Sequence, residues 1–268
     1  MRICIDISQT VYPRGVGRYT RELVSNLLKI DPKNQYILFG GSLRQQRSLK
    51  NFLTFLRPNT SNLTPKLYPI PPTILEFLFN QVHLSIDPFI GKVDVFHSSD
   101  WTQPKSYAKK ITTIHDMIVY RFPQLFDRKT ISVQKARLEW VKKEVDKIVA
   151  VSQNSKKDIV ETLQIPEKKI VVIYEAASSV FYPRNVKEIE AVKKKFGIKN
   201  DYILTVITRS SQKLGNLLGA FEKIKKDFKL QLVVVGEAPQ KNQEIITPGF
   251  LNDEDLASHF NDRISKLI

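Results

Sequence analysis

The fold is decided by the segment RICIDISQTVYPRGVGRYTRELVSNLL, residues 2–28. Its apolar run Ile3–Ile7 predicts a short buried strand, and Tyr19–Leu28 places apolar side chains at helical spacing. A loop that contains Gly15 and Gly17 is expected to join them. A buried strand that leads through such a loop into an amphipathic helix begins a βαβ unit, so the sequence predicts a parallel sheet.

The same alternation continues along the rest of the chain. Further strands are predicted at residues 35–39, 93–96, 111–114, 147–151, 169–174, 202–208, 230–236 and 244–246. Helices are predicted at residues 43–56, 73–84, 130–145, 156–163, 186–196, 215–227 and from 253 to the end. Ser152 or Asn154 is expected to cap the helix at 156–163. The stretch 58–72 is rich in turn residues and is expected to be irregular. Continuous Val/Ile/Leu runs separated by helices indicate an α/β fold with sheets covered on both faces.

The pattern restarts after a connector at Tyr182–Asn185. We therefore expect two Rossmann-like domains, residues 1–181 and 182–268. A complete second domain would need about 100–200 residues, so the second is expected to be incomplete.

The chain is strongly basic. Its 268 residues include 42 Lys and Arg against 27 Asp and Glu, a formal net charge of +15. Residues 201–268 hold nine basic and nine acidic side chains, so the excess lies in the first 200 residues. A basic surface can recruit an anionic membrane, a phosphorylated substrate or nucleic acid, or it can be solvated without a partner. No helix-turn-helix, RNA-recognition or zinc signature is present, which argues against nucleic acid.

Composition excludes several other classes. Cys4 is the single cysteine and is expected to be a buried thiol, so a disulfide scaffold is excluded. No Cys/His cluster has zinc spacing, and no run approaches the ~18–20 apolar residues of a membrane span. The N-terminus lacks the features of a secretory signal, so a cytoplasmic protein is expected.

Three places in the sequence could carry chemistry. Gly15-Val16-Gly17, with Arg18 beside it, precedes a predicted helix whose free N–H groups favour phosphate, although a tight turn without a ligand has the same pattern. His97 and His115-Asp116 follow predicted strands, where open parallel sheets bind ligands; buried packing histidines are the alternative. Arg209 and Lys213 follow the strand at 202–208 and could hold a diphosphate, or they could be solvated loop charges.

Taken in order, these motifs resemble a known family. The sequence resembles family-four retaining glycosyltransferases of the GT-B fold. The motifs that carry this resemblance are, in order, Arg2-x-x-x-Asp6, Gly15–Leu23, Asp94–His97, Thr113–Asp116, Ile148–Ser152, Lys169–Tyr174, Arg209–Lys213, Leu232–Gly236 and Gly249–Leu256. The resemblance covers nearly the whole chain.

The resemblance implies sugar transfer from a nucleotide sugar in a cleft between two domains, without metal or cofactor. His115 and Asp116 would lie at the reacting sugar as catalytic residues. The donor phosphates and sugar would be bound by Gly15, Val16, Gly17, Arg209 and Lys213, with Gly236 on the nucleotide side. Arg18 and His97 would lie on the acceptor side. The donor would be GDP-mannose or a UDP-sugar, and the acceptor a glycan or lipid-linked molecule at the inner face of a membrane.

One motif of the family is absent. Similar proteins carry Glu-x7-Glu late in the second domain, and no such pair follows Gly249. Glu167 and Glu175 have this spacing but flank a predicted strand of the first domain, so we interpret it as coincidence. We therefore expect a C-terminally truncated transferase with little activity on its own. The alternative is a non-catalytic remnant or partner subunit that binds a glycan, a membrane surface or a transferase.

Overall fold

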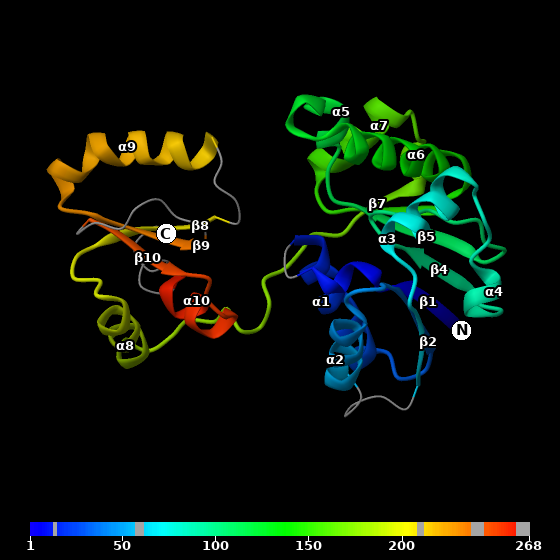
Figure 1. The fold of residues 1–268 in the computed structure, drawn as a ribbon, viewed down its shortest axis with the longest axis horizontal. Helices are drawn as coiled ribbons and strands as arrows, with labels where there is room; N and C mark the ends of the chain where they lie inside the picture. The colour runs from blue at the N-terminus through cyan, green and yellow to red at the C-terminus, as the bar shows by residue number, and fades with distance from the viewer. Residues whose placement is uncertain (13–14, 57–61, 208–211, 237–243, 261–268) are drawn as a thin grey trace. The chain divides into compact units, whose positions relative to one another are not determined.

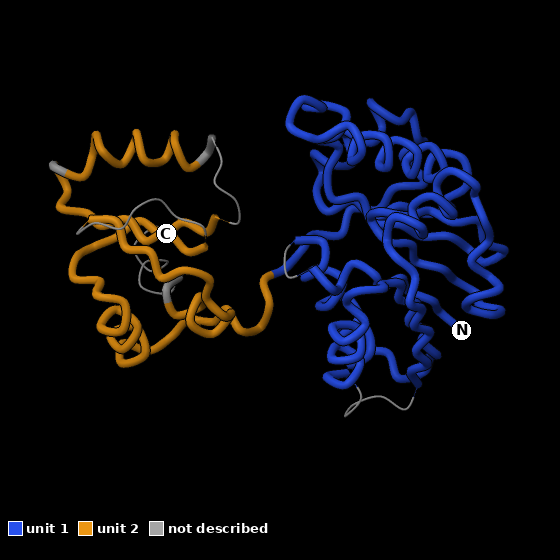
Figure 2. Tube along the Cα trace, viewed as in Figure 1, with its two compact units in different colours: residues 1–176 blue, residues 177–268 orange. Residues whose placement is uncertain are grey.

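The structure, a computed structural model, describes residues 1–12, 15–56, 62–207, 212–236 and 244–260. The side chains of residues 212, 213, 226, 259 and 260 are outside the description. The chain divides into two compact units, Met1–Ala176 and Ala177–Ile268 (Figure 2). The boundary predicted from the sequence lies a few residues further along the chain.

Unit 1 is built on a seven-stranded parallel sheet with strand order β3-β2-β1-β4-β5-β6-β7 (Figure 1). Its strands are β1 (Arg2–Asp6), β2 (Gln35–Gly41), β3 (Leu63–Tyr68), β4 (Val95–Ser98), β5 (Lys109–Ile114), β6 (Lys147–Ala150) and β7 (Ile170–Val172). The strand order reverses at β1, which pairs with both β2 and β4. Ligands of such sheets bind beyond the carboxyl ends of the strands at this reversal.

Helices connect the strands of unit 1. The α-helices are α1 (Gly15–Ile30), α2 (Gln46–Leu56), α3 (Pro72–Glu76), α4 (Asp87–Ile90), α5 (Ile118–Arg121), α6 (Arg128–Glu144) and α7 (Gln153–Leu163). Shorter turns are the 3₁₀ segments η1 (Ser8–Val11), η4 (Pro123–Leu125) and η5 (Glu167–Lys169) and the π-helical η3 (Phe77–Gln81). Ser152 caps α7, as one of the two predicted caps, because its side chain accepts a hydrogen bond from the Ser155 N–H at 3.0 Å.

Alternate residues of the central strands face two different cores. Ile5 of β1 and Leu38 of β2 pack in one cluster with side chains of α1 and α2. Cys4 and Phe39, their neighbours in the chain, pack in another cluster with α3, η3 and α4. Burial raises the pKa of the Cys4 thiol, so this cysteine is the inert buried thiol that the sequence predicts. The sheet is therefore covered by helices on both faces, as its apolar strands predict.

Two predictions of local structure were wrong, and a third, the helix 73–84, was right for residues 73–81 but changes to π-helical geometry at Phe77. Residues 63–68 form the strand β3 at the edge of the sheet. Proline has no N–H to donate to a neighbouring strand, and an edge strand tolerates Pro65 because one of its sides has no partner strand. The predicted helix 73–84 divides into α3 and the π-helical η3. The loop expected as far as Tyr19 is short, since η1 follows β1 and α1 already begins at Gly15.

Unit 2 has a smaller parallel sheet with the order β10-β9-β8 in the part that the structure describes. Its elements are α8 (Val186–Phe196), β8 (Tyr202–Ile207), α9 (Gln212–Phe228), β9 (Gln231–Gly236), β10 (Ile245–Gly249) and α10 (Asp253–Phe260). Val233 of β9 packs with Tyr202 and Leu256, and Val234 packs with Leu214 and Phe221 in a second cluster. This is the second α/β unit that the sequence predicts. None of the helices in the described ranges is long and apolar enough to cross a membrane.

Gly17 is required where α1 passes η1. A Cβ at this position would lie 2.1 Å from the carbonyl oxygen of Tyr12 and 2.6 Å from that of Gln9. We predict that Gly17→Ala lowers the free energy of unfolding by about 1–3 kcal/mol, because the backbone itself must move. Urea unfolding followed by circular dichroism measures this loss.

The matched control is Gly219→Ala in α9, where an added Cβ would meet nothing within 4 Å. Alanine favours a helix over glycine by about 0.5–1 kcal/mol, so this variant should be neutral or stabilised. A Gly17→Ala protein as stable as the wild type would contradict the packing role of Gly17.

Candidate functional site

The candidate site is a small cleft at the carboxyl ends of β1, β4 and β5. Polar and aromatic side chains from these strand ends and from α1 line it: Asp6, Gln9, Tyr19, Thr20, His97, Asp100, Thr113 and His115. The structure therefore brings His97 and His115 together, as their positions after neighbouring strands suggest. The cleft is formed within unit 1.

His115 is held from two sides. Its Nδ1 lies 3.0 Å from Oε1 of Glu175, and its ring meets the Tyr19 ring edge-on with centroids 4.7 Å apart. A carboxylate beside Nδ1 favours the tautomer with the proton on Nδ1, which leaves Nε2 as a hydrogen-bond acceptor. Sequence reasoning dismissed the Glu167–Glu175 spacing, and so missed Glu175 as the partner of His115. The signal in the sequence was the position of Glu175 directly after the predicted strand 169–174, where a side chain can reach the edge of the sheet.

Asp116 has a different role from its neighbour. Its Oδ1 accepts a hydrogen bond from the Ile118 N–H at 3.0 Å, at the start of α5. The side chain is exposed and is absent from the residues that line the cleft with His115. The two adjacent residues of the predicted catalytic pair therefore have separate environments.

His97 is a neutral hydrogen-bonding group. Its Nε2 lies 3.1 Å from Oγ1 of Thr113, which lies 3.1 Å from the hydroxyl of Tyr19. Burial, reinforced by the positive charge of Arg137, lowers the pKa of His97 to about 4. Three side chains from β4, β5 and α1 are thus joined in one hydrogen-bonded chain that is uncharged near neutral pH.

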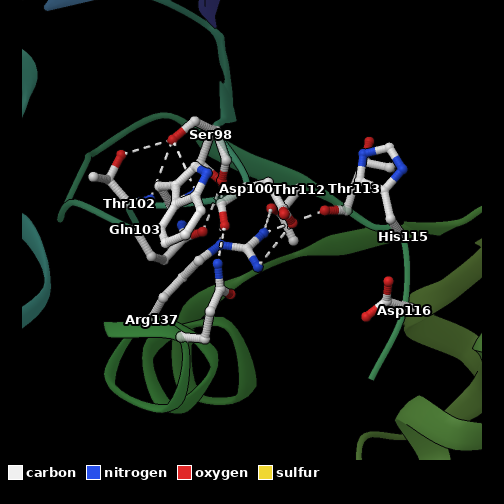
Figure 3. A network of polar contacts seen from close by, with 12 residues as sticks. Ser98, Asp100, Thr102, Gln103, Thr112, Thr113, His115, Asp116 and Arg137 are labelled. Carbon is white, nitrogen blue, oxygen red and sulfur yellow. Dashed lines mark hydrogen bonds and ion pairs between the residues drawn. The ribbon is translucent and has the colours of Figure 1, made fainter. Parts of the chain in front are cut away.

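Arg137 of α6 is a fully buried cation. Figure 3 shows its guanidinium beside Asp100 and Thr112. Its Nε donates to the Ser99 carbonyl at 3.2 Å, and its Nη2 donates to Thr112 Oγ1 at 2.8 Å and to the Thr113 carbonyl at 3.2 Å. Its Nη1 lies 3.3 Å from Oδ1 of Asp100. One guanidinium therefore joins the loop that follows β4 to the end of β5, next to His97 and His115. No motif in the sequence pointed to Arg137, because it lies among other charged residues of an amphipathic helix.

Two buried carboxyl groups complete the edge of the sheet. Asp6, at the end of β1, accepts hydrogen bonds from the Ser8 N–H at 2.8 Å and from Thr102 Oγ1 at 3.2 Å. Burial raises the pKa of Asp6 and also that of Asp100, against the opposing effect of Arg137 on Asp100. These groups order the loop after β4.

The predicted phosphate segment forms the first turn of α1. Gly15 is exposed, Val16 and Arg18 are half-buried, and Gly17 is buried against η1. The first four N–H groups of a helix have no partner within it, so this turn can still donate to an anion. Tyr19, one residue further, is the side chain by which α1 reaches the cleft.

In unit 2 the predicted residues are only partly described. Gly236 ends β9 with a φ of +102°, and a Cβ there would lie 1.9 Å from the Ile207 carbonyl oxygen, so only glycine fits. Arg209 lies outside the described residues. Lys213 lies in the first turn of α9, and its side chain is outside the description. Within the described ranges, no group of three or more His, Cys, Asp or Glu could hold a metal ion.

A larger pocket of about 320 Å³ lies beside the cleft and shares Gln9 and the loop after β4 with it. Its wall includes Tyr12, Leu75, Glu76, Trp101, Lys129 and Thr130. We call it the Trp101 pocket. Sequence reasoning did not find it, because its residues come from η1, α3, α6 and a loop that are far apart in the chain.

The fold and the site define the class of protein. Two parallel α/β units, the first with polar groups at the reversal of its strand order, are those of a GT-B fold. The family model of Glycosyltransferase Family 4 matches residues 13–177, more than half of the chain. The chain therefore belongs to Glycosyltransferase Family 4.

Individual relatives agree with this assignment. The O-antigen chain mannosyltransferase B of Escherichia coli is 22% identical over 241 residues, which are 88% of this chain and 63% of that protein. The chain thus spans less than two thirds of this relative. The glycosyltransferase of Rickettsia africae ESF-5 has a similar fold, with a TM-score of 0.62 at 17% identity over 97% of this chain and 70% of that one. Anabaena Alr3699/HepE, solved with UDP and glucose, has a TM-score of 0.60 at 14% identity and covers 96% of this chain and 71% of its own.

The low pKa of His97 predicts a pH effect on stability. Its pKa is about 4 in the folded chain against an ordinary 6.5, so the unfolded chain takes up this proton first as the pH falls. The contribution of His97 is complete above pH 6.5 and is lost between about pH 6.5 and 4. The free energy of unfolding of the wild type should therefore fall more steeply over this range than that of His97→Asn.

The comparison with His97→Asn is needed because the raised pKa values of Asp6 and Asp100 act in the opposite direction. Urea unfolding at several pH values measures the two slopes, and NMR titration of the His97 ring gives its pKa. Equal slopes, or a His97 pKa near 6.5, would contradict the prediction.

Proposed function

We propose that this chain transfers a sugar from a nucleotide-sugar donor to a hydroxyl group of an acceptor. The observation that carries the proposal is the cluster of Tyr19, His97 and His115 at the strand-order reversal of a Family 4 chain. Donor binding is supported by structural neighbours such as Alr3699/HepE, which was solved with UDP and glucose.

The reaction breaks the bond between the anomeric carbon and the diphosphate and forms a bond from that carbon to the acceptor oxygen. The acceptor proton leaves, and the nucleoside diphosphate carries away the bonding electrons. We assign His115 to the reacting sugar, where the carboxylate of Glu175 fixes its ring. Asp116 is assigned to the same side. We propose that the configuration is retained and that the sugar is mannose, as in the name of the Escherichia coli relative.

The donor phosphates and sugar are assigned to Gly15, Val16 and Gly17, which form the first turn of α1, where backbone N–H groups have no partner within the helix itself. Arg209 and Lys213 are assigned to the leaving diphosphate, whose charge two cations would neutralise in place of a metal ion. Gly236 would lie on the nucleotide side, because its lack of a side chain permits a close backbone approach.

The acceptor is assigned to the first domain, proposed as residues 1–181, and the nucleotide to residues 182–268. Arg18 and His97 are proposed on the acceptor side, with a glycan or a lipid-linked sugar as acceptor. His97 suits hydroxyl groups because a neutral imidazole can both donate and accept hydrogen bonds.

Donor binding can be tested without an acceptor. We predict that UDP or GDP raises the melting temperature of the full chain, since a ligand at 100 times its Kd stabilises by about 2.7 kcal/mol. His115→Ala should weaken binding of the matching nucleotide sugar while leaving the nucleoside diphosphate unchanged, because His115 is assigned to the sugar alone. Thermal shift and calorimetry measure the two affinities.

Glu175→Gln should show the same selective loss to a smaller degree, because it loosens His115. Glu167→Gln is the matched control, since Glu167 pairs with Lys156 on the surface. If no nucleoside diphosphate stabilises the chain at millimolar concentration, the proposed function is wrong.

We also propose that unit 1 associates peripherally with an anionic membrane. Residues 32–75 contain six Lys or Arg and no Asp or Glu. Arg44, Arg47 and Lys50, in and just before α2, are exposed, and Phe55 of the same helix is 71% exposed. Basic side chains near an anionic bilayer each contribute about 1 kcal/mol, and an exposed aromatic ring can enter the headgroup region.

The membrane proposal predicts that the chain sediments with vesicles containing phosphatidylglycerol and is released by salt. Changing Arg44, Arg47 and Lys50 to Gln should reduce binding at least tenfold, since about three favourable contacts are lost. Changing Lys187, Lys193 and Lys194 of α8 to Gln removes the same charge from unit 2 and should have little effect. Equal loss in both variants would reduce the proposal to a nonspecific charge effect and contradict the role of α2.

A further inference from the structure

The Trp101 pocket contains a carboxylate with unused hydrogen-bonding capacity. Glu76 of α3 is 16% exposed, and Lys129 Nζ, 3.8 Å away, is its single recorded partner in the described part of the chain. A carboxylate can accept about four hydrogen bonds, so most of its acceptor positions are open toward the pocket. Burial raises the pKa of Glu76, with Lys129 opposing this effect.

Several hydroxyl and carboxylate groups of the pocket already have partners. Ser99 Oγ lies 2.9 Å from Thr102 Oγ1, and Ser8 Oγ accepts a hydrogen bond from the Gly41 N–H at 2.9 Å. Both carboxylate oxygens of Asp127 accept from Thr130 at 2.8 Å, as the cap of α6. Compared with these groups, the Glu76 carboxylate has more acceptor positions left to bind hydrogen-bond donors of a ligand.

The remaining wall is aromatic and apolar. Trp101 and Tyr12 line the pocket together with Leu75, and aromatic side chains combine a flat apolar face with a polar edge. A sugar ring has the matching form, with an apolar C–H face and a rim of hydroxyl donors. A volume of about 320 Å³ is at the lower end of ordinary ligand pockets and suits a small ring rather than an extended chain.

The charges of the pocket select among sugars. Two carboxylates, Glu76 and Asp127, stand against one cation, Lys129, so the wall repels a phosphate or a second carboxylate. A neutral sugar ring is not repelled by these carboxylates and can donate hydrogen bonds to Glu76.

We propose that the Trp101 pocket binds an uncharged sugar ring of the acceptor, with Glu76 as the residue that accepts hydrogen bonds from its hydroxyls. This assignment rests on the proposed function, because only a sugar transferase has an acceptor. The binding itself requires no donor, so the two can be tested separately.

The chain offers an internal reporter for this test. Trp101 and Trp140 are its two tryptophans. Trp140 does not line the pocket, and its indole N–H donates to the Asn80 carbonyl at 2.8 Å. Two-dimensional ¹H–¹⁵N NMR of the full chain, with the indole signals assigned through Trp101→Phe, follows both rings. Methyl α-mannopyranoside and methyl α-glucopyranoside should shift the Trp101 signal and leave that of Trp140 in place, whereas mannose 6-phosphate should bind at least tenfold more weakly.

Variants of Glu76 test the selectivity. Glu76→Gln should weaken binding of the neutral glycosides about tenfold, because a hydrogen bond to a charged acceptor is lost. The ratio of the affinity for neutral glycosides to that for mannose 6-phosphate should also become smaller. The matched control, Glu139→Gln on the exposed side of α6, should leave both affinities unchanged. Thermal unfolding of both variants checks that each is folded.

The inference is overturned if the neutral glycosides do not shift Trp101 at 100 mM, if the phosphorylated sugar binds as well as the neutral ones, or if Glu76→Gln changes nothing. If nucleoside diphosphates stabilise the chain while glycosides leave Trp101 unmoved, the pocket assignment fails and the proposed function stands. If glycosides bind but no nucleotide does, the pocket is a glycan-binding site and the proposed transfer fails.

Discussion

The guanidinium of Arg137 donates hydrogen bonds to Ser99, just after β4, and to Thr112 and Thr113 of β5, and it pairs with Asp100. The loop after one strand and the end of the next are therefore held by one rigid, planar group. A buried cation with its donors satisfied gives the candidate site its shape.

The same helix extends this role along its length. From α6, Gln134 donates to the Asp100 carbonyl at 2.8 Å, and Trp140 donates to the Asn80 carbonyl at 2.8 Å. The N-terminal turn of α6 contributes Lys129 and Thr130 to the Trp101 pocket. One face of α6 thus supports both the cleft around His97 and the neighbouring pocket. Burial, reinforced by the positive charge of Arg137, also explains why the pKa of His97 is lowered and its imidazole is neutral.

Local patterns predicted the regular elements well. The runs that became β1, β2, β5 and β9 are rich in apolar and β-branched residues, as burial on both faces of a parallel sheet requires. The edge strand β3 escaped prediction, because Pro65 and half-exposed positions give no apolar run. The early start of α1 also escaped, since two glycines favour a loop locally; the close packing of Gly17 on η1 fixes the helix instead.

The sequence by itself determined the parallel α/β architecture, the restart in a second unit, and the presence of His97 and His115 at strand ends. These follow from periodicity and from the common direction of parallel strands, which local sequence encodes. Only the tertiary structure decided that Glu175 holds His115, that Arg137 holds the strand ends, and that Glu76 faces a pocket with Trp101. These contacts join residues 24 to 60 positions apart where no pattern links them, because pairing across such distances depends on how helices pack on the sheet.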